Sequence, residues 1–108
     1  MPTLEGVSKK NFYIQTKSWR LLADLIFDNC SDLIRDDERQ GWHESYGKMI
    51  SAGTAKAIAS RLERLIEQGI VDRYEAILEV TNMRSYFPRE ILTRFIEFCI
   101  ASGSFDIW

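Results

Sequence analysis

Four aspartates recur at intervals of four residues along the first helical stretch of the chain: Asp24, Asp28, Asp32 and Asp36. Residues four apart lie on one side of a helix, so this spacing predicts a stripe of carboxylates, although like charges at that spacing repel weakly. Asp37 and Glu38 extend the run. From position 24 to position 44, seven acidic and two basic residues give a local charge of −5, whereas the whole chain carries only −2.

Three interpretations of this carboxylate stripe follow from its chemistry. It could be a solvated helix face with no further role. It could attract a basic protein partner, because a concentrated charge raises association rates and repels partners of the wrong sign. It could also hold a divalent cation loosely, although oxygen-only sites usually need a loop to bring their ligands together.

A second candidate is the segment that follows the stripe, where Trp42, His43 and Tyr46 lie between two glycines. His43 beside Glu44 could form an acid–base pair or a contact for a partner, and the alternative is an ordinary surface histidine beside a tryptophan, Trp42, that anchors the loop in the core. His43 is the chain's single histidine. The sequence has no zinc-ligand spacing, phosphate-binding glycine loop or G-x-S-x-G motif, so we expect no metal, no cofactor and no catalytic residue.

Bulk properties narrow the class of protein further. A chain of 108 residues corresponds to one domain, and we expect residues 1–108 to form it. The net charge of −2 argues against nucleic-acid binding. No apolar run is long enough to span a membrane, and Lys9 and Lys10 are not followed by a signal-peptide core, so the expected compartment is the cytoplasm. Cys30 and Cys99 are then expected to be reduced.

Hydrophobic periodicity predicts helices along most of the chain. The expected segments run from Ser18 to about Arg35, from the cap Ser51 to Gly69, from Asp72 to about Thr81, and from Pro88 to Gly103. Asn11 to Gln15 alternates weakly and could be an extended arm. Asp36 to Ile50 is expected to be a loop, in which a small β-ribbon pairing with the arm is an open alternative.

These segments predict an all-α fold, a compact bundle of about four helices. The last residues include Phe105, Ile107 and Trp108, which would be costly to expose. We therefore expect a C-terminal apolar tail packed on the core.

Three blocks of sequence occur together in an order that carries a resemblance. They are Ser18-Trp19 opening a helix, Gly47-Lys48-Met49-Ile50-Ser51-Ala52 leading into an Ala-rich helix, and Phe95-Ile96-Glu97-Phe98-Cys99 followed by Gly103-Ser104-Phe105-Asp106-Ile107. Together they resemble a group of small, uncharacterised bacterial proteins, in which the tail commonly carries Gly-Gly-Phe where this chain has Ser104. The resemblance implies a shared fold and a bacterial origin, and it supplies no catalytic residue.

The sequence thus predicts a small cytoplasmic protein-interaction module, one version being an acidic inhibitor or immunity-type protein for a basic partner. The expected partner-binding residues are Asp24, Asp28, Asp32, Asp36, Asp37, Trp42, His43 and Tyr46. Two other classes stay open. One is an enzyme subunit that uses a metal or His43, and the other is a homo-oligomer whose apolar fourth helix completes its core across a symmetric interface.

Overall fold

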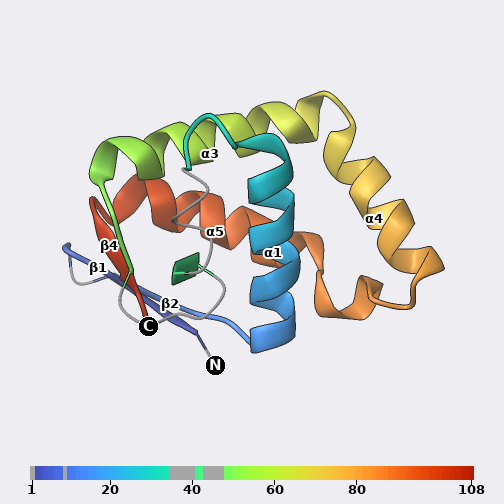
Figure 1. Ribbon diagram of the computed structural model, residues 1–108, viewed down its shortest axis with the longest axis horizontal. Coiled ribbons are helices and arrows are strands. Elements are labelled where there is room, and N and C mark those ends of the chain that lie inside the picture. Colours follow the sequence, from blue (N-terminus) through green and yellow to red (C-terminus); the bar gives the residue numbers. More distant parts are fainter. Residues whose placement is uncertain (1, 9, 35–40, 43–47) are drawn as a thin grey trace.

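A computed structural model gives the fold, and it describes residues 2–8, 10–34, 41–42 and 48–108. Figure 1 shows the arrangement of the elements. The described helices are α1 (Thr16–Asn29), α3 (Ala52–Glu67), α4 (Ile70–Val80), the short 3₁₀ helix η2 (Arg84–Tyr86) and α5 (Arg89–Ala101). The described strands are β1 (Thr3–Gly6), β2 (Asn11–Tyr13), β3 (Lys48–Ile50) and β4 (Phe105–Ile107).

The expected all-α bundle is wrong, because the described strands form a four-stranded antiparallel sheet in the order β2-β1-β4-β3. The fold is therefore mixed α/β. The C-terminal tail is not a coil laid over a helical core. It is β4, a central strand that pairs with β1 on one side and with β3 on the other.

The two segments with weak strand signals do contain strands, but they do not pair with each other. β2 lies at Asn11–Tyr13 and β3 at Lys48–Ile50, and they form opposite edges of the sheet. Each strand is only three or four residues long. A period of two cannot be read from so few residues, and the β1–β4 pairing joins segments about a hundred positions apart.

Local chemistry explains where α3 begins and ends, and it confirms the expected limits. The Ser51 hydroxyl accepts a hydrogen bond from the Thr54 backbone N–H, which caps the helix. Gly69 adopts a φ of 75°, a left-handed conformation that glycine reaches at little cost and that separates α3 from α4.

The other helices depart from expectation mainly at their ends. α1 ends at Asn29 rather than near Arg35, and the φ of −125° at Cys30 is no longer helical. The expected Asp72–Thr81 helix is confirmed within two residues as α4. Pro88 is the N-cap of α5 rather than its first residue, and its fixed φ suits either place.

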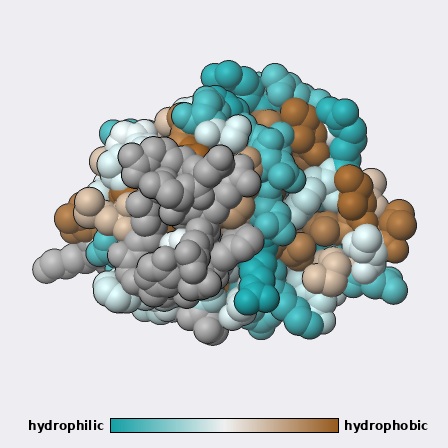
Figure 2. Space-filling view, viewed as in Figure 1, coloured by the Kyte–Doolittle hydropathy of each residue, from teal (hydrophilic) through white to brown (hydrophobic). Residues whose placement is uncertain are grey.

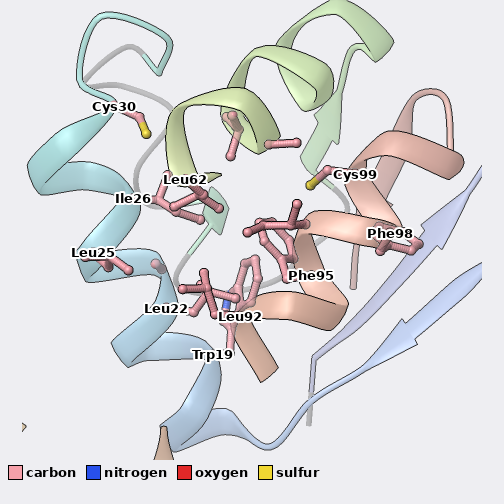
Figure 3. Close-up of a cluster of buried hydrophobic side chains, with 14 of the residues drawn as sticks. Trp19, Leu22, Leu25, Ile26, Cys30, Leu62, Leu92, Phe95, Phe98 and Cys99 are labelled. Carbon is pink, nitrogen blue, oxygen red and sulfur yellow. The ribbon is translucent and has the colours of Figure 1, made fainter. Parts of the chain in front are cut away.

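The core joins the inner face of the sheet to the helices through α5, which lies between them (Figure 1). Leu22 and Ile26 of α1 point toward α3 and α5, where they meet Leu62 and Leu92 (Figure 3). Phe95 of α5 is fully buried against rings from three different segments: Phe12, Trp19 and Phe105. The buried face of α5 is thus filled by side chains from within one chain, while Ile100 on its other side is exposed.

The end of the chain only partly follows expectation. Phe105 and Ile107 are buried, as predicted, because they alternate toward the inner face of the sheet. Trp108 is 52% exposed, so the expectation that it is buried is wrong. Its backbone exchanges two hydrogen bonds with Thr3, which extends the pairing of β4 with β1 by one residue. Within the described part of the chain, no helix has the length and apolar character needed to cross a bilayer.

Candidate interaction surface

The carboxylate stripe is only partly preserved in the structure. Asp24 and Asp28 lie on the exposed side of α1, one turn apart. Asp32 lies beyond the end of α1, so a single continuous helix face does not carry all of the aspartates. Asp36 and Asp37 lie outside the described residues.

Asp32 is neutralised by the protein itself. Both carboxylate oxygens of Asp32 accept hydrogen bonds from Arg61 of α3, at 2.9 and 2.7 Å. The hydrogen bonds from Arg61 are the main cause that lowers the pKa of Asp32 below its ordinary value. The same guanidinium donates to the backbone oxygen of Asn29, at the last turn of α1. Asp32 therefore helps to fasten α1 to α3 and offers less negative charge to a partner.

Asp24 and Asp28 lie close enough to α4 to affect the pKa of its residue Tyr74. The Tyr74 hydroxyl donates a 2.7 Å hydrogen bond to the backbone oxygen of Leu21, one turn before Asp24. The pKa of Tyr74 is raised to about 12, mainly by burial and in smaller part by the negative charges of Asp24 and Asp28. The exposed carboxylates of α1 thus lie near the α4 residue Tyr74, whose side chain reaches α1.

α4 carries exposed apolar side chains. Ile77 is 59% exposed and Val80 is 87% exposed. Ile77 lies one turn after Tyr74 and Val80 one turn further, and both are turned away from the buried face that Val71 and Leu78 form. Hydrophobic periodicity predicts that Ile77 points inward together with Leu78, and for Ile77 this prediction is wrong because Val71 and Leu78 form the buried face of α4.

Asp24, Asp28, Ile77 and Val80 together define what we call the α1–α4 surface. Figure 2 shows a hydrophilic band along α1 and hydrophobic atoms over the far end of α4. The band is mixed in charge, because Lys17 and Arg20 occupy the first two turns of α1. Lys17 Nζ lies 4.7 Å from the centre of the Tyr86 ring and so has a partner within the protein.

Trp42 is the predicted loop residue that the structure describes, and it does not join this surface. Trp42 is fully buried and stacks on Trp19, with ring centres 5.5 Å apart, so it is a core residue rather than an exposed anchor. The Trp19 indole N–H donates to the Trp42 backbone oxygen, while the Trp42 indole N–H has no hydrogen-bond partner among the described residues. His43 and Tyr46 lie outside the described residues.

The described residues include neither a metal-binding cluster nor an exposed thiol. Over the described residues, no group of three or more histidine, cysteine, aspartate or glutamate side chains could hold a metal ion. Cys30 and Cys99 are free and buried. Burial raises the pKa of the Cys30 thiol to about 11, and it raises the pKa of the Cys99 thiol as well, which disfavours the reactive thiolate.

The α1–α4 surface belongs to a mixed α/β protein with helices packed on one face of an antiparallel sheet. Protein-family models, curated proteins and solved structures were each compared with the chain, and none of them matches. The resemblance to small bacterial proteins accordingly stays a prediction.

Proposed function

We propose that this chain is a cytoplasmic protein-interaction module that binds a basic partner on the α1–α4 surface. The observation that carries the proposal is exposed Asp28 on α1, close enough to α4 to raise the pKa of Tyr74, together with exposed Ile77 and Val80 on α4 itself. A basic, partly apolar segment of a partner could pair with the carboxylates and cover the aliphatic side chains at once. Free, buried cysteines support the reducing compartment.

The contacts in the structure decide which carboxylates are suitable for a test by substitution. Asp32 is unsuitable, because its replacement would break the pair with Arg61 and loosen the contact between α1 and α3. Asp24→Lys combined with Asp28→Lys reverses the charge of the stripe at exposed positions. Glu63→Lys combined with Glu67→Lys is the matched control, since those residues are also exposed and four apart, on α3.

The experiment is affinity capture from lysate with the wild-type chain and both double variants, followed by identification of the retained proteins. The proposal expects basic proteins that the wild type and the α3 control retain and that the Asp24/Asp28 variant loses. Ile77→Ser should weaken the same capture, whereas Ile100→Ser, at an exposed position of α5, should leave it unchanged. Equal capture by all variants would refute the proposed surface.

A further inference from the structure

A cavity of about 340 Å³ lies where the N-terminal ends of α1 and α5 meet β2. Its wall includes the N-cap and the third residue of both helices: Gln15 and Ser18 of α1, and Pro88 and Ile91 of α5. This volume is at the lower end of the range that small-molecule sites occupy. The cavity is separate from the α1–α4 surface and shares none of its residues.

The backbone at this end of α1 is arranged to accept negative charge. The side chain of Gln15 makes no capping hydrogen bond, and the first turn of α1 contains no acidic residue. The first N–H groups of a helix lack partners within the helix, and the aligned peptide dipoles make this end positive. α5 differs, because Glu90 lies in its first turn and already interacts with its positive end. α1 is therefore the helix end that is open to a ligand anion.

Ser18 gives an independent reason to expect a ligand. Its side chain lines the cavity and is only 3% exposed. The Ser18 hydroxyl makes no hydrogen bond to any part of the chain that the structure describes. The Ser18 oxygen is not among the fully enclosed polar atoms that lack a partner in the described chain, so water can reach it from the cavity, and an acceptor atom of a ligand could replace that water.

The other residues that line the cavity indicate which chemical groups the ligand has besides a hydrogen-bond acceptor. Phe12, Ile14 and Ile91 supply apolar surface, and Arg94 supplies one positive charge. Arg94 forms an ion pair with Glu90, one turn earlier on α5, so the site carries little net positive charge. Such a site suits a single negative charge on an apolar body better than a phosphate group, whose charge approaches −2.

We propose that this cavity binds a small monocarboxylate with a hydrocarbon body. The carboxylate accepts hydrogen bonds from the Ser18 hydroxyl and from the free N–H groups at the start of α1. The hydrocarbon part contacts Phe12, Ile14 and Ile91.

The test is a titration of the isotope-labelled chain followed by NMR, with hexanoate as the probe. Hexanoate should give saturable shifts of the backbone amides of Ser18 and Ile91. Hexanol, which lacks the charge, should bind about tenfold more weakly, because hydrogen bonds to ionised groups are roughly twice as strong. Hexyl phosphate should also bind more weakly than hexanoate. The absence of saturable shifts, or equally tight binding of hexanol or hexyl phosphate, would overturn the proposal.

Variants assign the binding to this cavity. Ser18→Ala should weaken hexanoate binding about fivefold, the value of one hydrogen bond, while Ser60→Ala on the exposed side of α3 should not change it. Arg94→Gln should weaken it about threefold, and Arg64→Gln is its control. Both test residues can be changed with the fold monitored by circular dichroism. Unchanged affinity in a folded Ser18→Ala variant would contradict the assignment.

Discussion

Phe95 should be the side chain that most strongly couples the sheet to the helices. The loss in free energy of unfolding on its replacement can be estimated from its ring contacts. Its ring centre lies 5.8 Å from that of Phe12, 6.1 Å from that of Trp19 and 6.5 Å from that of Phe105. Each such edge-to-face pair contributes about 0.5–1.5 kcal/mol beyond the burial of area. Phe95→Leu, which keeps most of the apolar volume, should therefore lower the free energy of unfolding by about 2 kcal/mol. Phe95→Ala should lower it by about 3–5 kcal/mol, since it also leaves a cavity.

The assay is urea unfolding followed by far-UV circular dichroism and by tryptophan fluorescence. Ile77→Ala, at an exposed position, is the control and should change the free energy of unfolding by less than about 0.5 kcal/mol. A double-mutant cycle of Phe95→Leu with Phe105→Leu should give a coupling of about 0.5–1.5 kcal/mol. A Phe95→Leu variant as stable as the wild type, with no coupling to Phe105, would refute the packing of β4 on α5.

Three further outcomes are expected. Tyr74→Phe should lose about 0.5–1.5 kcal/mol of stability with the hydrogen bond to Leu21, as measured by urea unfolding. The pKa of Tyr74 is about 12 in the folded chain, and its ordinary value is 10.0. Its contribution to stability is therefore complete below about pH 10 and is lost as the pH rises through about 12. Tyr74→Phe should lack this part of the pH dependence. Gly69→Ala should cost about 1–2 kcal/mol through strain at positive φ alone, because no atom lies within 4 Å of the added Cβ, and Gly69→Asn should cost less in the same assay. Cys30 and Cys99 should resist a thiol reagent at about pH 8 in the folded chain and react once it is unfolded, and rapid labelling without denaturant would contradict their burial.

The helices were predictable because each carries its own signal. An apolar stripe together with the Ser51 cap and Gly69 defines α3 from local sequence alone. The sheet carries no such signal, since three- and four-residue strands pair only after the fold brings the two ends of the chain together. β4 thus looked like a tail, although Phe105 and Ile107 were correctly expected in the core.

The candidate surface was predictable only in part, for a similar reason. The spacing of Asp24 and Asp28 follows from the sequence, but the pairing of Asp32 with Arg61 joins residues 29 positions apart and depends on how α1 packs on α3. For Trp42 the sequence left a core anchor and a partner contact both open, because its stacking on Trp19 is likewise a long-range contact that local sequence cannot decide.

The most direct test of the proposed function is the association rate constant of a captured basic partner, measured at low and at high salt. The wild-type chain should associate at least about tenfold faster at low salt than the Asp24→Lys/Asp28→Lys variant, because opposite charges steer the encounter. At high salt the two rates should converge, and the Glu63→Lys/Glu67→Lys control should follow the wild type. Equal rates for the wild type and the Asp24/Asp28 variant at low salt would contradict the assignment of the α1–α4 surface as the binding site.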